Sequence, residues 1–215
     1  MEEWQDVLDS GRTVHALFPD VEKAFDRVDH GLLLAKLRSI GLNKSALMWI
    51  SSYLDGRHIR TTVDGMMSES KPIYSGVPQG SVLGPLLFLI YFADLPRAAK
   101  SLTAMFADDT LLYDLNCSCC HARPARSSTC TVVDDTPLMA CWAKEWNASI
   151  NAAKLTELIL TRSRCDQVTC SPLMMGSVVI PRTAVTKHIG VLLTENLSWG
   201  SHMNALIVKA DPRLL

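Results

Sequence analysis

The sequence predicts an α+β fold, because it contains two hairpin signals and several helical patterns. Two apolar runs rich in strand formers, 102–105 and 110–113, flank Phe106-Ala107-Asp108-Asp109 and indicate a hairpin with the Asp pair at its tip. Ile59, Thr61 and Val63 alternate as in a strand, and Asp64-Gly65 after them indicates a second hairpin. Elsewhere, apolar residues recur at helical spacing between capping residues and glycines.

The composition is typical of a globular chain of one domain or slightly more, with 215 residues, 48% apolar and 20% charged. The longest apolar run, Val82–Ala93, is too short to span a bilayer, so no membrane partner is expected. No secretory leader opens the sequence, and we expect an intracellular protein of the nucleus or cytoplasm. Seven irregularly spaced cysteines suggest free thiols in a reducing compartment. The net charge of −1 counts mildly against a self-sufficient nucleic-acid-binding domain.

The first part of the chain supplies a strand and two capped helices. Residues 1–13 indicate one or two helical turns, and residues 13–21 form a predicted strand that carries Asp20 at its carboxyl end. Pro19 is awkward there, because proline donates no ladder hydrogen bond. The helices that follow have N-caps Asp29 and Asn43 and apolar faces of Leu33, Leu37 and Ile40, then Leu47, Ile50, Tyr53 and Leu54.

Residues 75–85 are rich in glycine and proline, which predicts a tight loop. A helix is predicted to follow over 81–95, and Pro96 terminates it. The loop has two interpretations. In the first, the loop only reverses the direction of the chain. In the second, its glycines let the backbone approach a ligand closely, and the side-chain amide of Gln79 contacts that ligand.

The second half of the chain is less regular. Residues 116–135 contain possible metal ligands whose spacing matches no zinc template, so a variable surface loop is favoured: Cys117, Cys119, Cys120, His121 and Cys130. A helix over 137–150 has one face for which core packing is the default and base stacking the alternative: Leu138, Cys141, Trp142 and Trp146. Strands are predicted at 157–161, 178–180 and 188–193, and the last dozen residues indicate the start of a helix.

Acidic residues from two parts of the chain can form one site. If Asp20 and Asp108-Asp109 lie on adjacent strands of a sheet, two or three carboxylates lie within a few ångströms of one another. Such a cluster cannot stay ionised without cations. Carboxylate oxygens favour Mg²⁺, and two such ions stabilise the attacking and leaving oxygens of a phosphoryl transfer. The alternative for the Asp pair alone is a plain turn, where aspartate is common.

Three motifs follow one another along the chain: F-P-D-V-E-K-A-F-D at 18–26, S-G-V-P-Q-G-S-V-L-G-P at 75–85 and F-A-D-D at 106–109. In order and separation they resemble the palm motifs of reverse transcriptases from non-LTR (LINE-type) retrotransposons. Residues 142–161 are similar to the fourth motif, and residues 188–199 to the region that grips the primer. The resemblance, over most of 14–202, implies a polymerase palm in which helices back an antiparallel sheet.

The resemblance also implies an RNA-directed DNA polymerase that uses an RNA template, a DNA primer, a dNTP and two Mg²⁺ ions. It assigns metal binding to Asp20, Asp108 and Asp109, and protonation of the leaving pyrophosphate to Lys154. It assigns the nucleotide and template pocket to Phe25, which would block a ribose 2′-hydroxyl, and to Gly76, Gln79 and Gly80. It assigns the primer grip to Gly190 and Trp199. The alternatives are core packing for Phe25 and a solvated surface position for Lys154.

The sequence departs from the family pattern at Pro19, which replaces an apolar residue, and at Leu155, which separates Lys154 from Thr156 and would reverse side-chain faces within a strand. The chain begins just before the first motif and ends where a thumb should begin. We therefore expect an N-terminal remnant (1–13), a palm (14–165, with an irregular loop at 116–135) and a primer-grip-like region with a truncated C-terminus (166–215).

Two functions are compatible with these features. The first is a reverse transcriptase domain that still binds Mg²⁺. The second is a catalytically inactive remnant with at most weak nucleic-acid binding. We expect little or no polymerase activity from the isolated chain.

Overall fold

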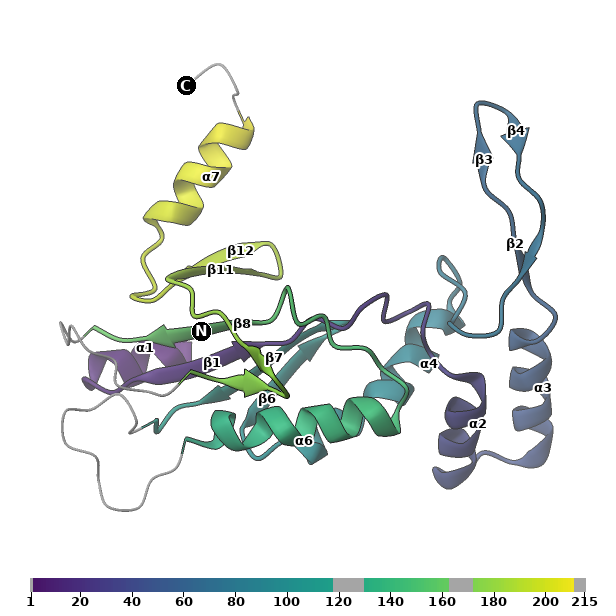
Figure 1. Ribbon diagram of the computed structural model, residues 1–215, viewed down its shortest axis with the longest axis horizontal. Coiled ribbons are helices and arrows are strands. Elements are labelled where there is room, and N and C mark those ends of the chain that lie inside the picture. The colour runs from purple at the N-terminus through teal and green to yellow at the C-terminus, as the bar shows by residue number, and fades with distance from the viewer. Residues whose placement is uncertain (1, 118–129, 163–171, 211–215) are drawn as a thin grey trace. The chain divides into compact units, whose positions relative to one another are not determined.

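The computed structural model describes residues 2–117, 130–162 and 172–210 (Figure 1). The chain forms two compact units. The sheet unit comprises Met1–Asp20, Pro96–Cys141 and Ile150–Leu215, and the helical unit comprises Val21–Leu95 and Trp142–Ser149. Each unit is therefore assembled from segments that are distant in the sequence.

A four-stranded sheet with antiparallel pairing organises the sheet unit, in the order β6-β7-β1-β8. Its strands are β1 (Val14–Phe18), β6 (Leu102–Phe106), β7 (Asp109–Asp114) and β8 (Thr156–Leu160). β1 lies between two strands, and each of its residues is buried. Burial on both faces explains why this strand is almost continuously apolar rather than alternating.

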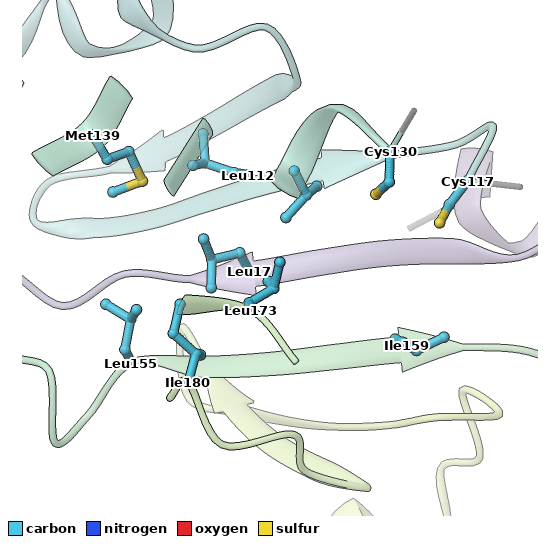
Figure 2. Close-up of a cluster of buried hydrophobic side chains, with 10 residues drawn as sticks. Leu17, Leu112, Cys117, Cys130, Met139, Leu155, Ile159, Leu173 and Ile180 are labelled. Carbon is cyan, nitrogen blue, oxygen red and sulfur yellow. The ribbon is translucent and has the colours of Figure 1, made fainter. Parts of the chain in front are cut away.

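The two faces of β1 contribute to two separate cores. Val14 and Phe18 belong to a cluster that includes buried side chains of helix α1 (Glu2–Asp9). Leu17 belongs to a second cluster, together with Met139 (Figure 2). Because side chains alternate along a strand, a register slip of one residue would exchange the two sets. Both cores therefore fix the register of β1.

Shorter elements complete the sheet unit. They are the hairpin of β9 (Met174–Met175) and β10 (Val178–Val179), the hairpin of β11 (Val185–His188) and β12 (Val191–Thr194), and helix α7 (Gly200–Ala210). The single strand predicted over 188–193 is wrong. The chain turns there at Ile189 and Gly190, whose φ angles are 47° and 79°.

The helical unit contains three of the predicted elements and two short strand pairs. Its helices are α2 (His30–Ser39), α3 (Lys44–Leu54) and α4 (Leu83–Phe92). β2 (His58–Ile59) pairs with β5 (Lys71–Pro72), and β3 (Thr62–Val63) pairs with β4 (Met66–Met67) around the predicted Asp64-Gly65 turn. The strand predicted up to residue 63 is thus split in two, and its residues are exposed.

The aromatic side chains near the end of α6 (Thr131–Glu145) pack within the helical unit. The ring centroids of Trp142 and Phe92 lie 5.3 Å apart, and Trp146 meets Tyr91 at the same distance. Lys36 Nζ lies 4.2 Å from the centroid of the Trp146 ring. The predicted core role of these tryptophans is therefore confirmed.

The predicted bounds of two helices are wrong. Helix α6 begins at Thr131 rather than at Pro137, which lies inside it. Proline cannot donate a hydrogen bond to the carbonyl four residues earlier, but the Thr136 hydroxyl donates to Val133 O at 3.1 Å and satisfies it. Helix α4 ends at Phe92, and Pro96 lies in the first turn of α5 (Leu95–Ala98), where its missing N–H does no harm.

Two side chains assigned to buried helix faces are also exposed. Ile40 follows the last residue of α2 and is 57% exposed. Cys141 lies on the exposed side of α6 and is a free thiol. Within the described ranges, no helix has the length and apolar character needed to cross a membrane.

The N-cap of α3 can be tested directly. The Asn43 side chain accepts a hydrogen bond from the Ala46 amide at 2.9 Å, as predicted. We expect Asn43→Ala to lower the free energy of unfolding by about 1 kcal/mol, because that amide loses its partner, while Asn43→Asp retains the cap. Urea unfolding of both variants provides the measurement, and an equal loss in the two would contradict the assignment.

Candidate active site

The predicted hairpin around the aspartate pair is present, with a small shift of its tip. Ala107 and Asp108 form the turn, Phe106 pairs with Asp109, and Asp109 is the first residue of β7. Ala107 has a φ of 53°, a left-handed conformation that is unfavourable for a residue with a Cβ. Both aspartate side chains are exposed. The turn therefore presents two carboxylates to solvent from a strained backbone, as functional sites often do.

Asp20 lies at the same end of the sheet. β1 pairs with β7 through Leu17 and Leu112, and continuing this antiparallel register to residue 20 leads to residue 109. Pro19 follows the last residue of β1, so it breaks none of the ladder hydrogen bonds, and the predicted damage to the central strand does not occur. The two acidic segments thus lie at the same end of the neighbouring strands β1 and β7.

Lys154 lies beside Asp20 on the other flank of β1. Its Nζ is 3.4 Å from Asp20 Oδ2, and the backbone amide of Asn151 donates to Asp20 O at 2.8 Å. Both side chains of the ion pair are partly exposed. The extra residue Leu155 precedes β8, which starts at Thr156, so it reverses no face within that strand.

His188 is a neighbour of this end of the sheet, and the sequence analysis placed it in the primer-grip-like region without a role of its own. Its ring lies 5.2 Å from the ring of Phe18, edge to face. Burial lowers the pKa of His188, and the nearby charge of Asp109 offsets part of that effect. No local signal points to His188, because β11 approaches the end of β1 only in the folded chain.

The residues predicted to line a nucleotide pocket lie in the helical unit. Phe25 stacks on Phe88 with ring centroids 4.1 Å apart, which supports its core-packing interpretation. Gln79 Nε2 donates to Asp26 Oδ1 at 2.9 Å, so the predicted free amide already has a partner. The glycine-rich loop therefore docks onto the end of the first motif, and Asp26 is a contact that the sequence analysis missed.

The glycines of this loop differ in their surroundings. Gly76 has a φ of 89°, and a Cβ built on it would lie 2.8 Å from both Cα and O of Asp26. Gly80 has a φ of 79° but faces open space. Close backbone approach thus requires a glycine at position 76.

The primer-grip candidates belong to the sheet unit. Gly190 completes the turn between β11 and β12, where His188 pairs with Val191. Trp199 is 58% exposed, and its ring lies 5.9 Å from that of His202. An exposed tryptophan beside a turn is available for contact with a ligand.

Residues 4–169 match the model of the reverse transcriptase (RNA-dependent DNA polymerase) family. The chain belongs to this family. It is 32% identical to the probable RNA-directed DNA polymerase from transposon BS of Drosophila melanogaster over 96% of this chain and 23% of that protein. It is also 32% identical to the RNA-directed DNA polymerase from mobile element jockey of Drosophila funebris, over 94% of this chain and 22% of that protein.

The predicted resemblance to non-LTR retrotransposon reverse transcriptases is therefore confirmed. The chain spans about a fifth of the length of these relatives. A telomerase from Candida albicans supports the predicted fold, with a TM-score of 0.51 and 14% identity over 92% of this chain and 32% of that one.

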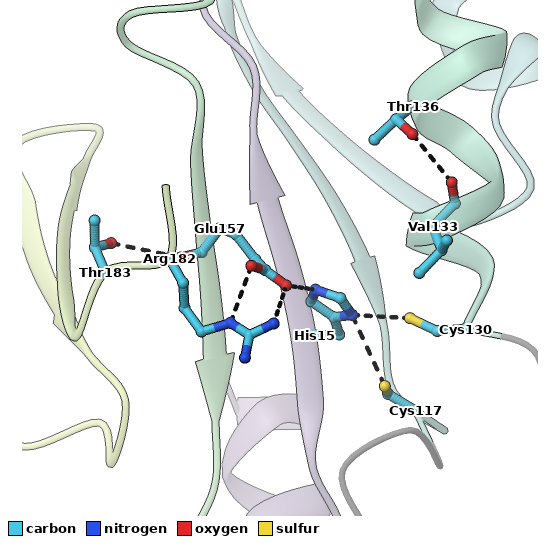
Figure 3. Close-up of polar contacts among 8 residues, drawn as sticks. All are labelled: His15, Cys117, Cys130, Val133, Thr136, Glu157, Arg182 and Thr183. Carbon is cyan, nitrogen blue, oxygen red and sulfur yellow. Dashed lines mark hydrogen bonds and ion pairs between the residues drawn. The ribbon is translucent and has the colours of Figure 1, made fainter. Parts of the chain in front are cut away.

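The chain also contains a buried polar network that the sequence analysis did not predict. His15 on β1 is fully buried, and its Nε2 lies 2.7 Å from Glu157 Oε1 on β8 (Figure 3). Arg182 donates to both carboxylate oxygens of Glu157, each at 3.0 Å. Burial raises the pKa of Glu157. The hydrogen bonds and the charges of His15 and Arg182 lower that pKa by more than burial raises it, so the net shift is downward.

Two cysteines lie on the other side of His15, and they bear on the predictions of free thiols and of metal ligands. Cys117 is disulfide-bonded, so the expectation of free thiols throughout is wrong. Cys130 Sγ lies 2.9 Å from His15 Nδ1. The other predicted metal-ligand candidates in this region, Cys119, Cys120 and His121, fall outside the described residues.

Proposed function

We propose that the chain is the palm of an RNA-directed DNA polymerase that extends a DNA primer on an RNA template with dNTPs. The observation that carries the proposal is the register between β1 and β7, which leads from residue 20 to residue 109. Membership of the reverse transcriptase family supports a polymerase reaction at this end of the sheet.

The donor set at this end suits Mg²⁺. Asp20 is half-buried and Asp108 and Asp109 are exposed, so carboxylate oxygens can be shared between the protein and a hydrated ion. Lys154 pairs with Asp20 alone of the three carboxylates, so bound cations would balance Asp108 and Asp109. Two Mg²⁺ ions at these side chains would neutralise the charge that develops when a primer 3′-hydroxyl displaces pyrophosphate from a dNTP.

The other assigned side chains position the substrates. Lys154 Nζ, held next to Asp20, would donate a proton to the departing pyrophosphate. Phe25, kept rigid by Phe88, would exclude a ribose 2′-hydroxyl. Gly76, Gln79 and Gly80 would line the nucleotide and template pocket, and Gly190 and Trp199 would seat the primer.

Primer extension tests the proposal. On a poly(rA)/oligo(dT) substrate with Mg²⁺, we expect the chain to give at most weak extension, and Asp108→Ala/Asp109→Ala to abolish it. Circular dichroism shows whether the double variant is folded. Extension that persists in the folded double variant would contradict the assigned carboxylates. No extension from the folded wild-type chain would favour the inactive remnant.

Lys154→Ala separates chemistry from folding. We expect it to reduce the rate of extension on the order of 10²-fold, because the leaving group loses its proton donor. The free energy of unfolding should change by no more than ~0.5 kcal/mol, since the ion pair with Asp20 is exposed. Single-turnover extension and urea unfolding measure the two quantities. Lys144→Ala, at an exposed lysine on α6, is the matched control and should leave both unchanged.

A further inference from the structure

A cluster of soft metal-ligand atoms lies inside the sheet unit, apart from the carboxylate end of the sheet. His15, Cys117 and Cys130 are all buried, and one ligand atom from each lies within 4.8 Å of the others (Figure 3). They come from β1, from the residues after β7 and from the residue before α6. His15 precedes Asp20 by five positions along the chain, so the two sites are separate.

The hydrogen bonds of His15 prepare it as a ligand. Both oxygens of Glu157 accept hydrogen bonds from Arg182, and a carboxylate has no proton to donate to a ring nitrogen. His15 Nε2 must therefore be the donor to Glu157 Oε1. In the neutral ring this leaves the lone pair on Nδ1, which lies 2.9 Å from Cys130 Sγ and 3.8 Å from Cys117 Sγ. A histidine oriented by a carboxylate in this way is the usual arrangement around protein-bound zinc.

A simple S–H···N hydrogen bond accounts for only part of this arrangement. One thiol is enough to satisfy Nδ1, and Cys130 already does so. The sulfur of Cys117, which is disulfide-bonded, lies 3.8 Å from the same nitrogen in the same buried space, so reduction would place a second thiol beside it. Two sulfurs and one imidazole nitrogen are the donor set that zinc prefers over magnesium.

We propose that, when Cys117 is reduced, His15, Cys117 and Cys130 bind a zinc ion, with Glu157 holding His15 in place. The disulfide of Cys117 must first take up two electrons and two protons from a thiol or phosphine reductant. Cys117 and Cys130 then lose their thiol protons as they bind the metal. The oxidised form of Cys117 and the zinc-bound form exclude each other.

The local spacing of cysteine and histidine in the sequence does not predict this site. His15 and Cys117 are 102 positions apart in the sequence, and the cysteine pattern by itself matches no zinc template. Bound zinc would link His15 of β1 to Cys117 and Cys130. Its role would be structural, unlike that of the ions proposed at the carboxylates.

Cobalt titration of the full chain, reduced with a phosphine, tests the proposal. Co²⁺ replaces zinc and gives thiolate-to-metal absorption that aspartate-bound Co²⁺ does not. We expect this absorption in the wild-type chain, in Cys141→Ser and in Asp108→Ala/Asp109→Ala. We expect at least a tenfold loss of affinity in Cys130→Ser and His15→Asn, and a 10–100-fold loss in Glu157→Gln, which keeps the shape but not the carboxylate.

Alkylation mapping of the wild-type chain covers the case in which a variant fails to fold. Zinc should slow the alkylation of Cys117 and Cys130, read out by mass spectrometry of peptides, while the exposed Cys141 reacts at the same rate. Absence of the thiolate absorption from the folded, reduced chain would overturn the proposal. Absorption without protection of Cys117 and Cys130 would overturn it as well, because the metal would then be bound elsewhere.

Discussion

Glu157→Leu is expected to lower the free energy of unfolding by about 3–5 kcal/mol. Glu157 is fully buried and is the shared acceptor of His15 and Arg182. Leucine fills much of the space but leaves a buried ring N–H without its acceptor and removes the two hydrogen bonds that Arg182 donates to Glu157. Urea unfolding followed by tryptophan fluorescence measures the loss.

Glu22→Leu is the matched control for this prediction. Glu22 pairs with Arg27 at 3.0 Å, and both side chains are more than 40% exposed. Removing an exposed pair of this kind should cost at most about 1 kcal/mol. Similar losses in the two variants would show that the buried network adds nothing beyond a surface ion pair.

The same network makes a prediction about acid stability. The pKa of Glu157 in the folded chain lies below its ordinary value of 4.5, so the unfolded chain binds a proton at this group first as the pH falls. The stabilisation is therefore complete above pH 4.5 and is lost as the pH falls through the folded-state pKa. The stability gap between wild type and Glu157→Leu should shrink over that range, and a gap that widens below pH 4.5 would contradict the shift.

Gly76→Ala is the second substitution with a large expected effect. The new Cβ would lie 2.8 Å from backbone atoms of Asp26, which cannot move aside as a flexible side chain can. The positive φ at residue 76 adds strain. We expect a loss of about 3 kcal/mol or more in the free energy of unfolding.

Gly80→Ala isolates the contribution of the clash. Gly80 lies in the same loop and has a similar φ, but nothing lies within 4 Å of its ideal Cβ. Its loss should be about 1 kcal/mol, from backbone strain alone. Equal losses at positions 76 and 80, measured by urea unfolding, would show that contact with Asp26 is not what requires the glycine.

Features with a local signal were predictable from the sequence. Asp29 and Asn43 cap their helices as expected, because each side chain bonds to an amide three residues later. The hairpin around Asp108 likewise follows from two short apolar runs and a turn. The placement of Asp20 beside it needed the family resemblance, since sequence separation alone does not determine which strands pair.

Features that depend on tertiary contacts were not predictable. Pro137 looked like a helix start, but the helix begins at Thr131, whose amide and hydroxyl both donate hydrogen bonds to the Asp114 carboxylate of β7 at 3.0 Å. His15 looked like an isolated histidine, because its carboxylate partner comes from a strand near the other end of the chain. In both cases the deciding contact leaves no periodic pattern in the sequence.

The central position of β1 has a consequence for synthesis on the ribosome. β1 is made well before its neighbour β8, because His15 and Glu157 are 142 residues apart. At typical translation rates, β1 waits roughly 7 to 28 s before β8 can pair with it. This apolar strand has two unpaired edges until β7 is made and one unpaired edge until β8 is made, which is a risk for aggregation. Nascent chains of this protein are therefore expected to need chaperone protection until β8 has left the ribosome.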